Sequence, residues 1–456
     1  MFRTLLHIRN VGSSIKNPTI AIVGAGPSGL YTCSSIFRKI PEVTIDVFDR
    51  SPVPFGLVRY GVAPDHADVK NCTKQFEKIF ETHKNNLSLF CNVAVGEDVT
   101  YEELCQNYDA VVLAYGASKS RQLNIPGIDA KNCFAGGDFV SWYNGAPCAN
   151  EPLLDKKNAV IIGNGNVSID CARILLQDVE KLRKYDIPNN ALLKLQQSSV
   201  SEVSLFGRRG PEDTSVTIKE FREFLRLEAA NVKIGTDLHY FDKLHVESMP
   251  RPKKRIMELM KKHVSDQEHQ QNHRKKGLVG FFTSPTRVFK DSNNRIEALE
   301  IKNNVTGELS TIECGLLVYA IGFDTFILKD IPQISQKMSM KDFCRVDNSS
   351  LSDKYKTYAT GWCAHGAKGV IANAQADAHL VSQEIINDII INDNVVNDNM
   401  ISDVVKDSST VKRGVKHLLV ERKTKFVDWD DWKELDNEER KIGVQYGKLK
   451  KTAKIY

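Results

Sequence analysis

The chain has 456 residues, of which 41% are hydrophobic and 26% are charged, and a formal net charge of +5. This length exceeds one typical core and predicts two domains, each of a size that binds a nucleotide. No apolar run approaches the roughly 20 residues of a membrane-spanning helix, so any membrane contact is expected to be peripheral. The modest charge argues against a general nucleic-acid binder.

The ten cysteines include no C-x-x-C or similarly close pair. This pattern argues against an ordinary zinc site, a locally spaced iron–sulfur site and a dithiol redox centre, so no metal is expected. A reduced intracellular protein fits this cysteine usage best.

The N-terminal segment is basic and free of acids. Arg3, Arg9 and Lys16 lie among apolar and small residues, and the first acidic residue is Glu42. Such a start resembles a mitochondrial transit peptide, which we expect to span residues 1–18 and to direct the protein to the matrix. The alternative is a frayed terminus that simply lacks carboxylates.

A first dinucleotide-binding pattern follows in TIAIVGAGPSGLYTCSSIF. An apolar strand precedes Gly24, Gly26 and Gly29, and an apolar helical pattern follows them. These glycines permit a tight turn, close approach of the backbone to a pyrophosphate, and close packing of the helix on the strand. The N–H groups at the helix start would face the phosphates. A structural glycine turn is the alternative, but the complete context favours a nucleotide.

The next predicted strand, TIDVFD, ends at Asp49, twenty residues after Gly29. A carboxylate at this position accepts hydrogen bonds from a ribose 2′-hydroxyl. Arg50 would suit a 2′-phosphate, but Asp49 opposes that choice. The first site is therefore predicted to bind FAD.

A second pattern, NAVIIGNGNVSIDCARILL, places Gly163 and Gly165 correctly and has Ser168 at the third position. The strand after its helix leads to Arg208 and Arg209 and not to an acid. Two guanidinium groups can bind a 2′-phosphate through charge-assisted hydrogen bonds, so this site is predicted to prefer NADP(H). Two solvated arginines at a turn are the alternative. Two dinucleotides in one chain imply hydride transfer between them.

The absence of two motifs argues against two ways in which electrons could leave the flavin. Without a C-x-x-C pair, the chain is not a disulfide reductase of the thioredoxin reductase kind. The segment FAGGDFVSW has the outline of a flavin monooxygenase signature, but Val140 stands at its histidine position. A partner protein or a diffusible acceptor such as a quinone remains.

The segment SPVPFGLVRYGVAPDHADVKN resembles the adrenodoxin reductase family, the mitochondrial NADPH:ferredoxin reductases. The resemblance continues through VVLAYGA, GRRGP, TIKEFRE, RPKKRIMEL, TGWCAHGAKGVIANAQADA and DWDDWKELDNEER. It implies an α/β fold with two Rossmann-like domains, in which an FAD-binding domain (19–118 and 326–456) is discontinuous around an NADP-binding domain (119–325). The apolar strands VVLAYGA and LLVYAIGF lie where the chain would leave and re-enter the first domain.

The resemblance also implies a function. NADPH would give a hydride to FAD, and single electrons would pass to an acidic 2Fe–2S ferredoxin of the adrenodoxin type. That ferredoxin would serve mitochondrial cytochromes P-450, or iron–sulfur and haem synthesis, and the enzyme would at most associate peripherally with the inner membrane. The rivals are a quinone or small-molecule reductase and a nucleotide-sensing flavoprotein without turnover.

Family site residues map onto this sequence by the resemblance. The FAD contacts, with the fingerprint glycines, are Gly24, Gly26, Ser28, Gly29, Asp49, Leu57, Val95, Trp362, Gly369, Val370 and Ile371. The NADP contacts are Gly163, Asn164, Gly165, Asn166, Val167, Arg208, Arg209, Glu220 and Gly369. Three departures are Asp49 in place of Glu, Ser168 in place of a smaller residue, and Ala367-Lys368 in place of Pro-Thr.

Three further residues have two interpretations each. His66 is either a structural histidine or part of a proton route to the flavin, and Asp170 either takes part in catalysis or complements a helix dipole. Trp362 either packs in the core or lies near the flavin.

Charge is concentrated in residues 250–276, which contain nine Lys and Arg and three Asp and Glu. The resemblance places Arg222, Arg251 and Arg255 in a docking patch for the acidic ferredoxin, and a solvated helix face is the alternative. The Asn/Asp-rich residues 392–400 are expected to form a surface connection.

Overall fold

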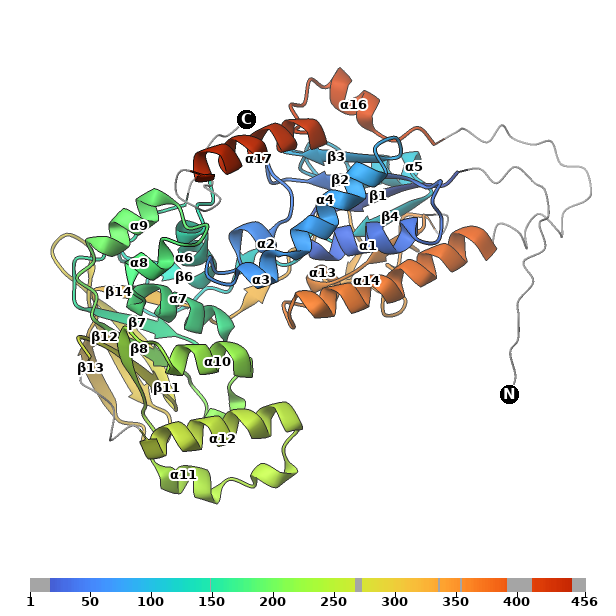
Figure 1. The fold of residues 1–456 in the computed structure, drawn as a ribbon. Helices are drawn as coiled ribbons and strands as arrows, with labels where there is room; N and C mark the ends of the chain where they lie inside the picture. Colours follow the sequence, from blue (N-terminus) through green and yellow to red (C-terminus); the bar gives the residue numbers. More distant parts are fainter. Residues whose placement is uncertain are drawn as a thin grey trace, which may run out of the picture.

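The computed structural model describes residues 17–147, 149–266, 273–334, 337–352, 355–391 and 412–444. Nearly all of the predicted transit peptide and the whole of segment 392–400 lie outside these residues. Two separate parallel sheets are each flanked by helices (Figure 1), which confirms the predicted α/β fold class. No helix in the described part of the chain is both long and apolar enough to cross a bilayer.

The first sheet has five parallel strands in the order β18-β4-β1-β2-β3. They are β1 (Thr19–Val23), β2 (Thr44–Asp49), β3 (Leu87–Cys91), β4 (Ala110–Leu113) and β18 (Thr357–Ala359). Strands from residues 19–113 and from the distant segment 357–359 therefore build this sheet together. Ile20, Ile22 and Val112 are fully buried, as expected for apolar strands covered on both faces.

Helices cover this sheet and extend along its edge. They are α1 (Pro27–Phe37), α2 (Leu57–Tyr60), α3 (Ala67–Lys70), α4 (Cys72–Thr82), α5 (Tyr101–Asn107), α13 (Trp362–His365), α14 (Ile371–Ile386) with a π-helical turn (Asn387–Ile391), α16 (Lys416–Glu421) and α17 (Trp429–Val444). Pro27 begins α1, because its fixed φ and missing N–H suit the first helical position. Helix α1 packs against α14 and α4.

The second sheet has six parallel strands in the order β6-β14-β7-β8-β10-β9. They are β6 (Cys133–Ala135), β7 (Asn158–Ile162), β8 (Glu202–Phe206), β9 (Ala230–Ile234), β10 (Lys275–Gly280) and β14 (Leu316–Tyr319). A three-stranded antiparallel sheet accompanies it, with β11 (Thr283–Lys290), β12 (Ile296–Asn303) and β13 (Leu309–Glu313).

The helices of this second part are α6 (Gly136–Tyr143), α7 (Asn166–Leu176), α8 (Val179–Leu182), α9 (Asn189–Gln196), α10 (Ile218–Leu225), α11 (Leu238–Lys243) and α12 (Arg251–Asp266), with short turns η1 (Pro211–Asp213) and η2 (Val246–Ser248). Helices α11 and α12 pack on each other and form a lobe at one end of the molecule (Figure 1).

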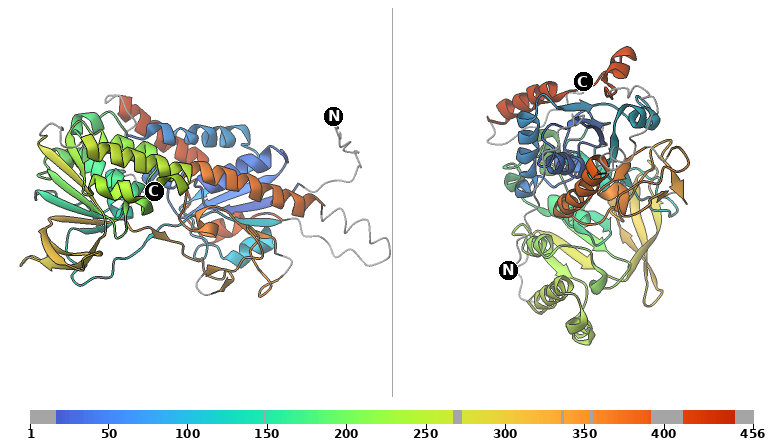
Figure 2. Two further views of the ribbon diagram at one scale, coloured as in Figure 1. Left: turned by 90° about the horizontal axis from the view of Figure 1, so that it is seen from below. Right: turned by 90° about the vertical axis from the view of Figure 1, so that its right-hand side faces the viewer.

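A narrow ribbon connects the two parts. The chain leaves the first sheet through β5 (Lys119–Ser120) and returns through β15 (Phe323–Asp324), and these two strands pair antiparallel. The two connecting segments run side by side in Figure 2. The apolar strands that we predicted at the two crossing points are β4 and β14. A small hairpin, β16 (Gln333–Ile334) and β17 (Lys337–Met338), follows the return.

Candidate functional site

The first glycine-rich turn joins β1 to α1 at the carboxyl end of the first sheet. Gly24 has a φ of +118°, and a Cβ there would lie 2.4 Å from the Ala114 carbonyl oxygen. A Cβ on Gly29 would lie 2.1 Å from the Gly24 carbonyl oxygen. A Cβ on Gly26, in contrast, would meet no atom within 4 Å. The open space over Gly26 fits a phosphate that approaches the backbone.

Asp49 braces this turn. Its Oδ2 accepts a hydrogen bond from the Ala25 N–H at 2.8 Å, and its Oδ1 accepts one from the Ser51 N–H at 2.8 Å. Burial raises the pKa of the Asp49 carboxyl, although both hydrogen bonds oppose that shift. Each carboxylate oxygen keeps a second lone pair for a ribose hydroxyl. The sequence predicted that Asp49 contacts the ribose, but it did not predict that Asp49 also holds the turn through these two hydrogen bonds.

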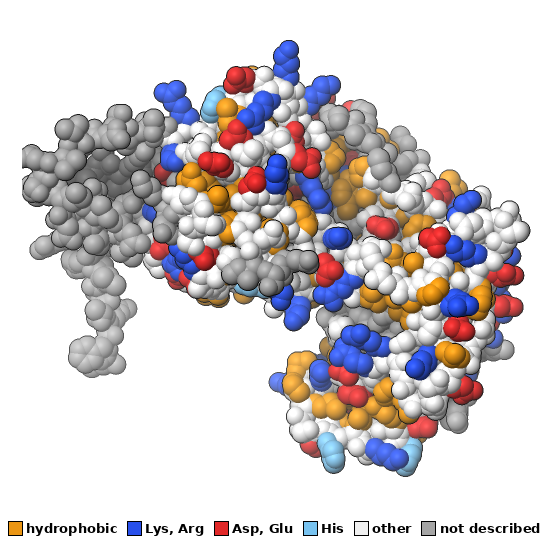
Figure 3. All heavy atoms as spheres, turned by 180° about the vertical axis from the view of Figure 1, so that it is seen from behind, with side chains coloured by type: hydrophobic (Ala, Val, Ile, Leu, Met, Phe, Trp, Pro, Cys, Tyr) orange, Lys and Arg blue, Asp and Glu red, His pale blue; other side chains and the backbone are white. Residues whose placement is uncertain are grey.

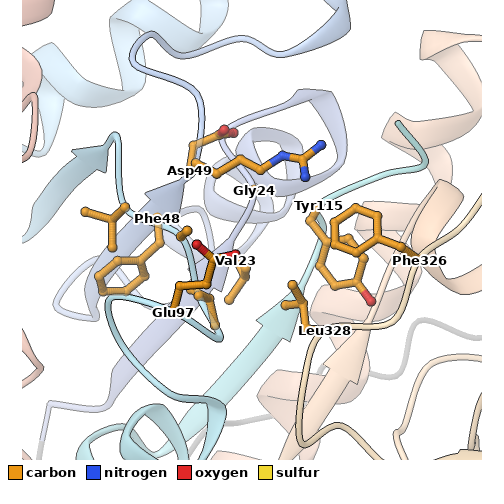
Figure 4. A pocket seen from close by; sticks show the side chains of 12 residues that line it. Val23, Gly24, Phe48, Asp49, Glu97, Tyr115, Phe326 and Leu328 are labelled. Carbon is orange, nitrogen blue, oxygen red and sulfur yellow. The ribbon is translucent and has the colours of Figure 1, made fainter. Parts of the chain in front are cut away.

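A pocket opens beside Gly24 and Asp49 (Figure 4) and is also lined by the predicted Val95. Arg50 also lines it, together with three residues that the sequence did not single out, Glu97, Tyr115 and Phe326. The Tyr115 and Phe326 ring centroids lie 5.0 Å apart, and the Arg50 guanidinium carbon lies 5.0 Å from the Phe326 centroid. Flat rings of this kind offer a stacking face for an adenine.

Arg50 does not compete with the predicted FAD assignment. One of its Nη atoms donates to the Ser118 hydroxyl at 2.6 Å, and its guanidinium lies over the Phe326 ring. Its charge is therefore engaged by Ser118 and the ring. Nothing in the spacing of the sequence links Arg50 with Phe326, which lies beyond the second crossing.

Apolar residues next to the first turn are left open to solvent. Leu57, at the start of α2, is 42% exposed, and Val370, just before α14, is 50% exposed. A Cβ on Gly56 would lie 3.4 Å from the Gly26 Cα, so the start of α2 lies against the fingerprint turn. Exposed apolar groups in this position fit the predicted contacts with a flat flavin ring.

The segment 361–370 begins against the start of α1. A Cβ on Gly361, which has a φ of +68°, would lie 2.0 Å from the Ser28 Oγ, so the predicted FAD contacts Ser28 and Trp362 are brought together. Trp362 is only half-buried, and its Nε1 donates to the Lys368 carbonyl at 2.9 Å. This bond anchors the loop in which Ala367-Lys368 departs from the family pattern. Gly369 has a φ of +85°.

The second glycine-rich turn joins β7 to α7. Gly163 has a φ of +126°, and a Cβ there would lie 2.3 Å from the Ala320 carbonyl oxygen and 2.9 Å from the Ser168 Oγ. Ser168 is fully buried, so its side chain occupies the space that a glycine would leave. Asn166 Oδ1 accepts from the Thr217 N–H at 2.8 Å, which ties the start of α7 to the start of α10.

Two exposed arginines follow β8. The Arg209 Nη1 lies 3.2 Å from an Asp213 carboxylate oxygen, in a pair whose side chains are 59% and 38% exposed. Arg208 forms no ion pair with any residue that the structure describes. A cationic group is therefore available at the strand end, and it fits a 2′-phosphate.

An ionic cluster, buried except for the exposed Glu223, joins the two parts of the molecule. His66 precedes α3 and is buried; its Nε2 lies 3.1 Å from a Glu223 carboxylate oxygen, and its Nδ1 lies 3.9 Å from a Glu220 carboxylate oxygen. Arg173 is 3% exposed, lies 2.5 Å from an Asp170 carboxylate oxygen and contacts Asp65. The candidates His66, Asp170 and Glu220 thus belong to one cluster.

Burial dominates the electrostatics of this cluster. It raises the pKa of the Asp170 carboxyl well above its usual range, and the Glu220 and Glu223 carboxylates raise it further. It also lowers the pKa of Arg173 to about 10. Two further ion pairs link the same surfaces, with N–O distances of 2.9 Å for Lys70–Asp186 and 2.7 Å for Lys219–Asp68.

The basic segment 250–276 does not form one surface. Lys275 lies in β10, where its Nζ donates to the Leu175 carbonyl at 3.0 Å and burial lowers its pKa. On α12, Lys254 and Lys261 are paired with Glu247 and Asp242, at 2.5 Å and 2.8 Å. Residues 267–272 lie outside the described part of the chain.

The three predicted docking arginines take no part in these lysine contacts. Arg251 and Arg255 are exposed on α12, and Arg222 lies on α10, which packs against α12. None of the three forms an ion pair within the described residues. Lys and Arg side chains gather around the hollow beside the α11–α12 lobe (Figure 3).

The part of the chain that the structure describes contains neither a metal site nor a disulfide bond. There, no group of three or more His, Cys, Asp or Glu side chains could hold a metal ion. The nine described cysteines are all free.

Comparison with known proteins identifies the family. The model of the pyridine nucleotide-disulphide oxidoreductase family matches residues 18–378. The mitochondrial NADPH:adrenodoxin oxidoreductase of Salvelinus fontinalis is 35% identical over 95% of this chain and 88% of its own length. This chain belongs to the NADPH:adrenodoxin oxidoreductase family.

Other members and one solved structure agree with that assignment. The protein of Schizosaccharomyces pombe described as a probable mitochondrial NADPH:adrenodoxin oxidoreductase is 32% identical over 97% of this chain and 94% of its own. The structure of Mycobacterium tuberculosis FprA in complex with NADPH has a TM-score of 0.84 and 31% identity, over 96% of this chain and 97% of that one. The resemblance inferred from the sequence is confirmed.

Proposed function

We propose that this chain is a mitochondrial FAD-dependent oxidoreductase that carries electrons from NADPH to a 2Fe–2S ferredoxin of the adrenodoxin type. The observation that carries the proposal is the pair of nucleotide turns, one followed by Asp49 and the other by Arg208 and Arg209. Relatives over nearly the whole chain are NADPH:adrenodoxin oxidoreductases. FAD, when bound, accepts a hydride and releases electrons one at a time, which suits a one-electron iron–sulfur acceptor.

We assign one nucleotide to the domain built on each of the two sheets. FAD lies on the domain formed by residues 19–118 and 326–456, and NADP(H) lies on residues 119–325. FAD is held by Gly24, Gly26, Ser28, Gly29, Asp49, Leu57, Val95, Trp362 and the run Gly369, Val370 and Ile371. NADP(H) is held by Gly163, Asn164, Gly165, Asn166, Val167, Arg208, Arg209, Glu220 and Gly369.

The buried cluster at the junction serves to orient the two nucleotides. Hydride transfer requires no protein base, so the main task of the chain is to hold nicotinamide and flavin in contact. His66 links the loop before α3 to Glu223 on α10, and Arg173 links Asp65 to Asp170. Because the pKa of Asp170 is raised, its carboxyl holds a proton at a higher pH than an ordinary aspartic acid.

Replacing Asp49 with Ala is expected to weaken FAD binding by at least about ten-fold. The substitution removes the ribose acceptor and also leaves the Ala25 and Ser51 N–H groups without their acceptor, and each such bond to a charged group contributes roughly 1.5–3 kcal/mol. Flavin absorbance of the purified protein and FAD titration measure the loss. Full FAD retention would show that the first turn holds another ligand or that the ribose contact is unimportant.

Reversing the charge of Arg251 and Arg255 to Glu is expected to raise the ferredoxin KM roughly ten-fold. These arginines have no acidic partner among the described residues, so they can attract an acidic protein. Wild-type ferredoxin-dependent turnover should fall as the Debye length shrinks to about 8 Å. NADPH-driven reduction of a small artificial acceptor should stay nearly unchanged.

A matched control is the double reversal of Lys423 and Lys425 to Glu. Both lysines are exposed and lie after α16, on the first domain, and their reversal changes the net charge equally. This variant should leave the ferredoxin KM unchanged. If Arg251→Glu with Arg255→Glu also leaves it unchanged, α12 is only solvated surface; equal loss of both activities would assign the two arginines to folding or cofactor binding.

NADPH-driven reduction of cytochrome c tests the proposed function. The proposal predicts rapid reduction only when ferredoxin is added to the FAD-loaded protein. Reduction of a quinone at the same rate without ferredoxin would favour the quinone reductase. Bound flavin that NADPH fails to bleach would favour a nucleotide sensor.

A further inference from the structure

The C-terminal helix α17 is tied to the first domain outside the nucleotide site. Val427, two residues before the helix begins, pairs with Cys91 of β3 through backbone hydrogen bonds of 2.9 and 3.0 Å. The Trp429 ring stacks on Phe80 of α4 at a centroid distance of 4.3 Å. The helix runs above α2 and α4 (Figure 1). None of the residues proposed to contact FAD lies on α17.

A buried ion pair links α17 to the short helix α2. The Arg59 Nη2 lies 2.7 Å from the Glu439 Oε1, and the two side chains are 6% and 0% exposed. The Arg59 guanidinium carbon also lies 5.0 Å from the Trp432 ring centroid and 5.1 Å from that of Tyr60. This pair joins residues that are 380 positions apart in the sequence.

Helix α17 also contacts Phe55, which lies just before α2. Phe55 has a φ of +80°, which is a strained value for a residue with a Cβ. Its ring packs edge-on against Trp432 at a centroid distance of 5.6 Å. Its N–H donates to the Ala25 carbonyl of the first glycine-rich turn at 2.9 Å. The strained conformation thus places the Phe55–Gly56 backbone against Gly26.

We propose that α17 is a clasp that positions the FAD-facing loop, with Glu439 acting on Arg59 and Trp432 acting on Phe55. The two contacts on α17 hold residues 55–59 at both ends. Between the two contacts, the Phe55–Gly56 backbone lies against the turn at Ala25 and Gly26, and the side chain of Leu57 is exposed. Glu439 and Arg59 are therefore positioning residues for FAD, a role that rests on the proposed function only for the presence of FAD in the first site.

Replacing the pair with apolar residues, as Arg59→Met with Glu439→Leu, tests the clasp. Buried ion pairs replaced by apolar residues of similar volume usually keep the stability of the fold. We expect thermal unfolding near the wild-type temperature, a dissociation constant for FAD raised about ten-fold, and an altered visible spectrum of the bound flavin. An unchanged FAD dissociation constant would overturn the proposal.

Arg440→Met is the matched control on the same helix. Its Nε lies 2.8 Å from an Asp436 carboxylate oxygen and its Nη2 lies 3.3 Å from a Glu77 carboxylate oxygen, so it contacts α4 and not α2. It should leave FAD binding unchanged. An equal loss of FAD in this control would mean that any weakening of α17 has the same effect, which contradicts a specific clasp.

Hydrogen exchange of the full-length wild-type protein tests the clasp without a substitution. Addition of FAD is expected to slow amide exchange in residues 53–61 and also in α17. Slower exchange in 53–61 with no change in α17 would overturn the proposal. A wild-type protein that binds no FAD would instead refute the proposed function, so the two failures are distinguishable.

Discussion

Replacing Arg208 and Arg209 together with Ala is expected to lower kcat/KM for NADPH roughly 100-fold, mainly through KM, while NADH kinetics barely change. Two lost charge-assisted hydrogen bonds to a 2′-phosphate together cost about 3 kcal/mol of binding. NADH lacks that phosphate, so its binding does not depend on the two guanidinium groups. Steady-state kinetics with both nucleotides and an artificial acceptor measure the difference.

The single variants should be unequal. Arg209 shares its charge with Asp213 at 3.2 Å, whereas Arg208 has no acidic partner in the described chain, so Arg208→Ala should cost more than Arg209→Ala. Arg226→Ala, an exposed arginine at the end of α10, serves as the control and should change neither nucleotide. Equal losses with NADH and NADPH would show that the pair does not recognise the 2′-phosphate.

Replacing Arg173 with Met is expected to destabilise the protein by about 3–5 kcal/mol and to slow hydride transfer. The change leaves the buried carboxyls of Asp65 and Asp170 without their cation. Asp65 lies in the loop before α3 and Asp170 lies on α7, so one of the ion-pair links between the two parts of the molecule is lost. Urea unfolding and rapid-mixing reduction of bound flavin by NADPH measure the two effects.

The loss should depend on pH with a definite sign. A carboxyl whose pKa is higher in the folded than in the unfolded state binds its proton more tightly when folded, so folding is favoured as the pH falls. The deficit of Arg173→Met should therefore shrink from about pH 7 to about pH 5. Adding Asp65→Asn and Asp170→Asn should restore part of the stability. A deficit that grows on acidification would contradict this account.

Arg183→Met is the matched control for this variant. Arg183 pairs with Glu180 at 3.0 Å, and both side chains are largely exposed. An exposed ion pair contributes little to stability, so this change should alter stability little and should leave flavin reduction unchanged. A loss as large as that of Arg173→Met would show that burial of the ion pair is not what matters.

Local patterns in the sequence were sufficient for the two nucleotide turns. The closest contact that a Cβ on Gly24 or Gly163 would make is with the backbone that follows a neighbouring strand, at Ala114 and Ala320, yet the spacing of the glycines between an apolar strand and a helix predicted both turns. The apolar strands at the two crossing points were likewise predicted, because burial on both faces produces continuous apolar runs. The discontinuous arrangement of the first domain was an implication of the family resemblance, and the order of the strands within each sheet was not predicted.

Contacts between distant segments could not be predicted in this way. Arg173 with Asp65, Phe326 with Tyr115 and Arg59 with Glu439 each join residues that no periodicity relates. Composition also misled in residues 250–276, where a run of charges predicted one patch. Lys275 instead enters β10, and Lys254 and Lys261 of α12 are paired with Glu247 and Asp242.

Electron counting under anaerobic conditions tests whether this protein passes electrons from NADPH to a 2Fe–2S ferredoxin. FAD-loaded protein is mixed with oxidised 2Fe–2S ferredoxin in excess and a limiting, known amount of NADPH, and ferredoxin reduction is followed by its visible absorbance. We expect two ferredoxin molecules to be reduced for each NADPH oxidised, with no reduction when the protein lacks FAD. NADPH oxidation that leaves ferredoxin oxidised would contradict this expectation.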